Sequence, residues 1–218
     1  MFDGQTPLEF TSRSTAISVS STSLIRNTIA VSAAFIFSIG VALGSTALIA
    51  VLFGLSRDAD AFFMAILLPR FIMTIFNGTL PQVLIPAVSG TRTEESEARH
   101  RKLINNLLSV GTLVGVPAYA LLIYFGPVGV KLMAPGFDGP SLKLCNELFC
   151  YAAIGVPLSF HTEVLSAYLN SRSVFALPSG AEAVRSAFVV AALVLFHKTW
   201  GIHAAVYGFF VGYVLQLL

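Results

Sequence analysis

The sequence predicts an all-α fold, a polytopic bundle of transmembrane helices, on three observations. Hydrophobic residues make up 56% of the chain and charged residues only 11%, whereas a soluble domain carries about 25% charged residues. The mean hydropathy is +0.81. Several stretches with almost no charge are long enough to cross a bilayer core of ~30 Å, which takes about 20 apolar residues in a helix. The composition therefore excludes an ordinary soluble domain.

The same composition narrows the functional classes. The sequence has no basic block with interleaved aromatic residues, so we expect no nucleic-acid partner. Cys145 and Cys150 are expected in one helix, about 7.5 Å apart along its axis, which is too far for a disulfide bond. Neither a metal-binding Cys/His spacing nor a nucleophile–base constellation is present. We therefore expect no metal, no cofactor and no enzymatic activity.

Six membrane helices are expected after a polar segment rich in Ser and Thr, residues 1–26, which we predict to be a cytoplasmic tail. They are predicted at residues 27–55, 61–88, 103–130, 144–170, 174–196 and 202–218. The first apolar run exceeds the ~7–15 residues of a signal-peptide core, so we expect it to be retained. In this run Gly40 and Gly44 form a GxxxG pair, which favours close helix packing in lipid, although glycine is also simply common in membrane helices.

The links between the helices carry most of the charge. Residues 89–102 are predicted to be a solvated loop or a surface helix, and residues 131–143 a Gly/Pro-rich external loop. The last run ends while still apolar, so we expect truncation before a second bundle. Arg and Lys are more numerous on the side of the N-terminus, which predicts that this side is cytoplasmic. They are Arg13, Arg26, Arg92, Arg99, Arg101, Lys102 and Arg172, against Arg57, Lys131, Lys143 and Lys198 on the other side.

The second predicted helix carries a single charge in its interior, Arg70. An unpaired cation facing lipid at such a position costs ~2.5–3.5 kcal/mol. Arg70, Thr74 and Asn77 fall at i, i+4 and i+7, so they share one face of the helix. We interpret this polar stripe as the wall of a cavity; the alternative is an arginine that snorkels to the membrane surface.

Two later helices add further ionisable groups. Glu163 lies within the predicted helix 144–170, and Glu182 and Arg185 lie at i and i+3 in the next. That spacing allows an intrahelical ion pair, which is either structural or part of a site. Because ionisable residues inside a membrane are functional candidates, we predict one substrate-binding site. It comprises Arg70, Thr74, Asn77, Glu163, Glu182 and Arg185.

Several short motifs resemble, in order, the MurJ/MviN family of lipid II flippases, within the superfamily of multidrug and lipid-linked oligosaccharide exporters. They are FG at 53–54, DAFF at 60–63, LP at 68–69, IF at 75–76, APGF at 134–137, LN at 169–170 and VLQL at 214–217. The resemblance extends from residue 27 to the end of the chain. It departs from the family pattern at basic positions: residues 38–46 carry no charge, and Leu67, Met73 and Thr74 stand where the family has basic residues.

The resemblance implies the first lobe of a fold in which two pseudo-symmetric helical bundles surround a cavity. It also implies a transporter of the bacterial inner (cytoplasmic) membrane that moves a polyprenyl-pyrophosphate-linked saccharide by alternating access. The substrate would be lipid II or a related cell-envelope glycan precursor. On this interpretation Arg70 meets the pyrophosphate and Asp60 acts at the outer gate.

Two other functions stay open. A cation- or proton-coupled multidrug exporter would share the architecture, and Glu163 and Glu182 would suit a proton relay. A truncated, non-transporting membrane scaffold would fit the missing cations and the short chain. A transporter would also need a partner bundle, either a C-terminal half or a second copy of the chain.

Overall fold

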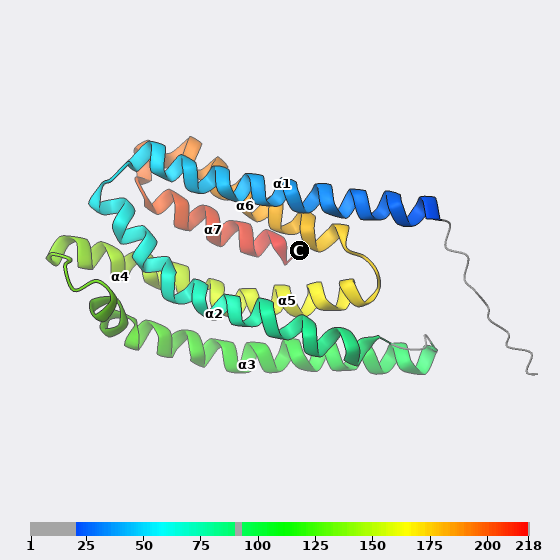
Figure 1. Ribbon diagram of the computed structural model, residues 1–218. Coiled ribbons are helices and arrows are strands. Elements are labelled where there is room, and N and C mark those ends of the chain that lie inside the picture. Colours follow the sequence, from blue (N-terminus) through cyan, green and yellow to red (C-terminus); the bar gives the residue numbers. More distant parts are fainter. Residues whose placement is uncertain (1–20, 90–92, 218) are drawn as a thin grey trace, which may run out of the picture.

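A computed structural model describes residues 21–89 and 93–217, most of which lie in α-helices (Figure 1). The helices are α1 (Ser21–Phe53), α2 (Arg57–Val88), α3 (Glu94–Met133), α4 (Gly139–Ala153), α5 (Gly155–Ser171), α6 (Ala176–Trp200) and α7 (His203–Gln216). Within the described residues, five segments are long and apolar enough to cross a membrane, with α4 and α5 together as one of them. The all-α transmembrane bundle predicted from the sequence is confirmed.

Several helices begin earlier than the sequence suggested. α1 starts at Ser21, so the last residues of the expected tail are helical, whereas residues 1–20 lie outside the described part of the chain. α2 starts at Arg57 because the side chain of Ser56 caps its first turn. The charged residues 94–102 are the first turns of α3, capped by Thr93, and neither a loop nor a separate helix.

The predicted single helix 144–170 is divided into α4 and α5 at Ile154. Pro157 follows the break, and a proline inside a helix lacks the N–H donor and its ring clashes with the carbonyl four residues earlier. That residue is Ala153, where α4 ends. α7 lies within the predicted range 202–218; it has 14 residues and, within the described residues, is not among the five candidate spans.

The helices form two layers (Figure 1). In one layer α6 packs against both α1 and α7, and in the other α2 packs against α4 and α5, with α3 against α5 and α4. At one end the layers meet in a shared core, to which α1, α2, α4, α6 and α7 each contribute. Its members include Ile49, Phe62, Leu148, Leu193 and Val206. A smaller buried cluster, Met73 of α2, Val156 of α5 and Tyr213 of α7, also joins the two layers.

Glycines allow α7 to lie directly on α6. A Cβ atom added at Gly212 would lie 2.8 Å from the carbonyl oxygen of Arg185, and one at Gly208 would lie 2.8 Å from that of Phe188. These positions form the GxxxG pair that brings two helices together. Gly40 and Gly44 contact no other helix among the described residues, since nothing lies within 4 Å of a Cβ added at either, and the packing role of this pair stays a prediction.

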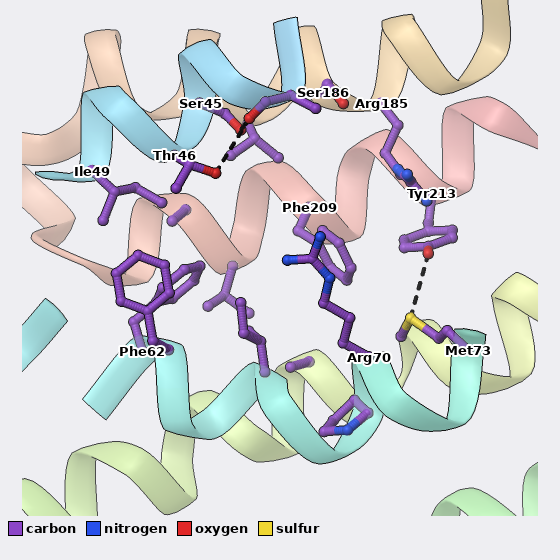
Figure 2. A pocket seen from close by; sticks show the side chains of 18 of the residues that line it. Ser45, Thr46, Ile49, Phe62, Arg70, Met73, Arg185, Ser186, Phe209 and Tyr213 are labelled. Atoms are coloured by element: carbon purple, nitrogen blue, oxygen red, sulfur yellow. Dashed lines mark hydrogen bonds between the residues drawn. The ribbon is translucent and has the colours of Figure 1, made fainter. Parts of the chain in front are cut away.

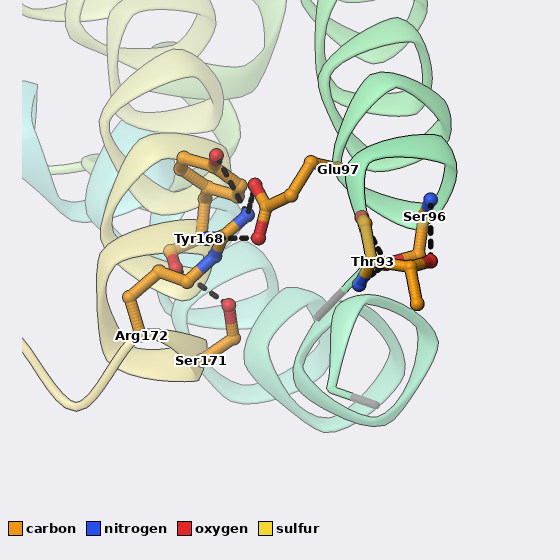
Figure 3. Close-up of polar contacts among 6 residues, drawn as sticks. All are labelled: Thr93, Ser96, Glu97, Tyr168, Ser171 and Arg172. Carbon is orange, nitrogen blue, oxygen red and sulfur yellow. Dashed lines mark hydrogen bonds and ion pairs between the residues drawn. The ribbon is translucent and has the colours of Figure 1, made fainter. Parts of the chain in front are cut away.

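An ion pair joins α3 to the C-terminal end of α5 (Figure 3). Arg172 donates from Nη1 and Nη2 to the two carboxylate oxygens of Glu97, at 2.6 and 2.5 Å. Its guanidinium also donates to the Tyr168 hydroxyl at 3.0 Å and lies 4.9 Å from the centre of that ring. The hydrogen bond to Glu97 raises the pKa of Arg172. We call Arg172, Glu97 and Tyr168 the α3–α5 clasp.

A second ion pair ties the opposite end of the same layer. Arg57, at the start of α2, pairs with Asp138, the N-cap residue of α4. Asp138 also accepts a hydrogen bond from the Ser141 N–H at 3.0 Å. Hydrogen bonds from Ser141 hold the pKa of the Asp138 carboxyl below its usual value. Ion pairs therefore join helices of the α2 to α5 layer at both of its ends.

Candidate binding cavity

A cavity of about 330 Å³ lies between the two layers. Residues of α1, α2, α6 and α7 form nearly all of its wall, and the shared core closes one end (Figure 2). Such a site between packed helices is where bundles commonly bind ligands. Its two ends differ sharply in polarity.

The end next to the shared core is apolar. Ile49 of α1, Phe62 and Ile66 of α2, Val189 of α6 and Val206 of α7 line it. Figure 2 shows Ile49 and Phe62 together at this end, away from the charged side chains. An alkyl or isoprenoid group would lose contact with water here, at a gain of about 25 cal/mol per Å² of apolar area.

The α2 side of the polar end is the stripe predicted from the sequence: Arg70, Thr74 and Asn77 all line the cavity. The Thr74 hydroxyl donates to the Arg70 carbonyl at 2.9 Å, so it satisfies a backbone group. None of the described residues forms a hydrogen bond or ion pair with the Arg70 guanidinium, which extends from α2 into the space beside Phe209 (Figure 2). This cation is available to a ligand.

The opposite wall carries a second arginine that is held in place. Arg185 of α6 donates from Nη2 to Glu182 Oε1 at 3.1 Å. Its guanidinium carbon lies 4.7 Å from the centre of the Tyr213 ring and 6.0 Å from that of Phe209, both on α7. These are cation–π distances. Glu182 and Arg185 both line the cavity.

Glu163 of α5 does not line the cavity and lies next to Asn77 of α2. With its amide nitrogen turned toward α5, Asn77 donates to Glu163 Oε1 at 3.2 Å and to the Met73 carbonyl at 2.9 Å. The Tyr213 hydroxyl donates to the Met73 sulfur at 3.5 Å. Met73 and Asn77 thus connect α2 to α7 and α5 at the polar end.

Asp60 lies apart from the other predicted residues. It is exposed on the first turn of α2 and does not line the cavity. The structure thus brings Arg70, Thr74, Asn77, Glu182 and Arg185 around one space, with Glu163 behind Asn77. The gate role of Asp60 stays a prediction.

Sequence reasoning missed the contribution of α7 and part of α1. Phe209 and Tyr213 form the aromatic floor under Arg185, and Ser45 and Thr46 line the wall from α1. The sequence did indicate close packing of α7, because Gly208 and Gly212 have the GxxxG spacing, with Phe209 between them in the chain. Within the described residues no group of three or more His, Cys, Asp or Glu side chains could hold a metal ion.

The fold and the cavity define a membrane protein with several spanning helices and an amphiphilic site between two helix layers. The sequence profile of the family described as lipid II flippase MurJ matches residues 49–218, and the chain belongs to this family. The resemblance stated from the short motifs is confirmed.

Two members of the family show how similar this chain is to its relatives. The lipid II flippase MurJ of Thermosipho africanus is 25% identical over 196 residues, which cover 89% of this chain and 40% of the relative. A probable lipid II flippase MurJ of Buchnera aphidicola subsp. Acyrthosiphon pisum is 31% identical over 145 residues, 61% of this chain and 26% of the relative. The chain therefore spans less than half the length of these relatives.

A solved structure has the same fold. The structure of the lipid II flippase MurJ in its inward closed conformation superposes with a TM-score of 0.73 at 23% sequence identity. The match covers 87% of this chain and 40% of that one.

Proposed function

We propose that the chain forms part of a flippase-like transporter that moves a polyprenyl-pyrophosphate-linked saccharide, lipid II or a related glycan precursor, across the cytoplasmic membrane by alternating access. The observation that carries this proposal is the amphiphilic cavity. Arg70 lies at its polar end with no protein partner among the described residues, while apolar side chains line the other end. A lipid with an anionic headgroup matches this cavity, because its headgroup can meet Arg70 and its apolar chain can lie at the apolar end.

The division into two layers supports alternating access. The cavity lies between the layers, which the shared core joins at one end, so a small change in the angle between the layers would widen or narrow it. Relatives named as lipid II flippases are much longer than this chain. The proposal therefore includes a partner bundle, either a C-terminal half or a second copy of the chain.

The proposal also includes the orientation of the helices in the membrane. The ends of α2 and α5 and the start of α3 lie at one side of the bundle (Figure 1), and exposed Arg99, Arg101 and Lys102 lie there. The excess of basic residues on this side supports a cytoplasmic location for it, and hence a cytoplasmic N-terminus.

A flipping assay tests the proposal. The protein and its variants are reconstituted in proteoliposomes with a fluorescent polyprenyl-pyrophosphate-linked disaccharide, and the fraction of label exposed outside is followed with time. We expect Arg70→Gln to slow flipping ~10-fold or more, since it removes the free cation of the cavity. Arg101→Gln is the matched control, because Arg101 is exposed and does not line the cavity. Equal rates for both variants and the unmodified protein would contradict the proposal.

A second candidate is a cation- or proton-coupled multidrug exporter. The observation that favours it is the pair of carboxylates at the polar end, Glu182 on the wall and Glu163 behind Asn77. Such a protein would bind a lipophilic cation, and Arg70→Gln would leave its export unchanged or improve it. Tetraphenylphosphonium efflux from the same proteoliposomes separates the two candidates.

A further inference from the structure

The charged side chains that line the cavity are few and unevenly balanced. Arg70, Glu182 and Arg185 are the charged residues among those lining it in the described part of the chain. Two cations and one anion give the lining a net charge of +1. An anionic headgroup therefore meets one cation that is free and another that already has a counter-ion.

Arg185 is fixed in its position by three kinds of contact. Glu182 accepts its hydrogen bond at 3.1 Å, and the Tyr213 ring lies 4.7 Å from its guanidinium carbon. Gly212 brings the backbone of α7 close enough that an added Cβ would lie 2.9 Å from the Arg185 Cγ. Only a fifth of the Arg185 side chain is exposed. Without Glu182, the rings and the glycine would still hold the guanidinium at the wall.

Glu182 differs from Arg185 in its surroundings. Half of its side chain is exposed, it lines the cavity, and it contacts the guanidinium from the same helix at i and i+3. Its carboxylate accepts one hydrogen bond of the Arg185 guanidinium, which a phosphate oxygen would otherwise accept. A ligand anion must displace this carboxylate or bind Arg185 through its remaining donors.

We propose that Glu182 sets the charge preference of the cavity by acting as an internal counter-ion of Arg185 that competes with an anionic headgroup for the guanidinium. This inference rests on the proposed function and deepens it, since it names the residue that limits affinity for the anionic carrier. Removal of the Glu182 charge raises the net charge of the lining to +2. Affinity for an anionic amphiphile then increases, and affinity for a lipophilic cation decreases.

Glu163 provides a matched control within the same polar cluster. It is the same residue type but does not line the cavity, and its carboxyl group accepts a hydrogen bond from Asn77. Glu163→Gln removes this carboxyl group without freeing a donor of Arg185. The two Glu→Gln variants therefore separate competition at Arg185 from a general change of electrostatic potential.

The test is equilibrium binding to the protein in nanodiscs of zwitterionic phosphatidylcholine. The probes are geranylgeranyl diphosphate, its neutral alcohol, and tetraphenylphosphonium. We expect Glu182→Gln to bind the diphosphate ~10-fold more tightly and the cation more weakly, with the alcohol unchanged, and Glu163→Gln to change diphosphate affinity only ~2-fold. Glu182→Ala repeats the measurement should the glutamine variant aggregate.

The outcomes separate this inference from the proposed function. Diphosphate binding that Glu182→Gln does not strengthen overturns the inference alone, as do equal gains for Glu182→Gln and Glu163→Gln. Binding of tetraphenylphosphonium without binding of the diphosphate by any variant overturns the proposed function. A selective gain for Glu182→Gln supports both.

Discussion

The two helix layers are held together in different ways. The layer of α2 to α5 is tied at its ends by ion pairs between elements, Arg172 with Glu97 and Arg57 with Asp138. In the layer of α1, α6 and α7, the described residues form no ion pair between two helices of that layer, and α7 lies on α6 through Gly208 and Gly212. Ion pairs at the helix ends stabilise the layer of α2 to α5, whereas close backbone packing stabilises the layer of α1, α6 and α7.

This difference bears on the cavity that the layers enclose. The two ion pairs lie at the ends of the helices and do not line the cavity, so they can rigidify the layer of α2 to α5 without filling the site. The α6–α7 contact lies beside the cavity, because Gly212 contacts Arg185, which lines it. Loss of either ion pair should therefore lower stability alone. A substitution at Gly212 should change both stability and ligand binding.

The largest effect is expected for Gly212→Ala. The added methyl group would lie 2.8 Å from a backbone oxygen and 2.9 Å from a backbone carbon of Arg185, so α7 must move away from α6. Overpacking of this kind costs about 1–3 kcal/mol, and it should shift Tyr213 and weaken diphosphate binding. Thermal unfolding in detergent measures the first effect. Gly40→Ala is the control, since nothing lies within 4 Å of its added Cβ; equal losses would contradict the packing argument.

A smaller effect is expected for Arg172→Gln. The variant loses the bidentate pair with Glu97 and the contact with the Tyr168 ring, and we expect Tm to fall by roughly 2–4 °C. Diphosphate binding should stay unchanged, because the clasp does not line the cavity. Arg99→Gln is the control, as its pair with Glu95 is largely exposed and such pairs contribute little. Non-additive losses for Arg172→Gln and Glu97→Gln would verify the coupling between the two residues.

The smallest effect is expected at Asp138, and it depends on pH. The folded state lowers the pKa of this carboxyl, so its charge stabilises the fold above the ordinary pKa of about 3.9 and ceases to do so as pH falls through the lowered value. Asp138→Asn keeps a capping side chain and removes the charge. We expect its Tm to lie roughly 1–2 °C below that of the unmodified protein at pH 7. The gap should shrink in acid; a gap that widens would contradict the sign.

The sequence predicted the helices well where charge-free runs define them, and it placed Arg70, Thr74 and Asn77 on one face from spacing alone. Pro157 alone does not predict the break at Ile154, since Pro69, Pro81, Pro86, Pro117 and Pro127 lie inside unbroken helices. The contacts across the cavity could not be predicted either. Arg185 meets Tyr213 and Asn77 meets Glu163 only because α2, α5, α6 and α7 converge, and no local pattern encodes which helices become neighbours.

The central claim is that an anionic amphiphile binds between the two layers with its headgroup at Arg70. Photocrosslinking with a diazirine-bearing polyprenyl diphosphate, followed by peptide mapping, tests it most directly. We predict labelled peptides from α2 around Arg70 and from α7 around Tyr213, with labelling lost in Arg70→Gln. Labelling confined to outer surfaces such as that of Leu113, which is 74% exposed, and unaffected by Arg70→Gln would contradict the account.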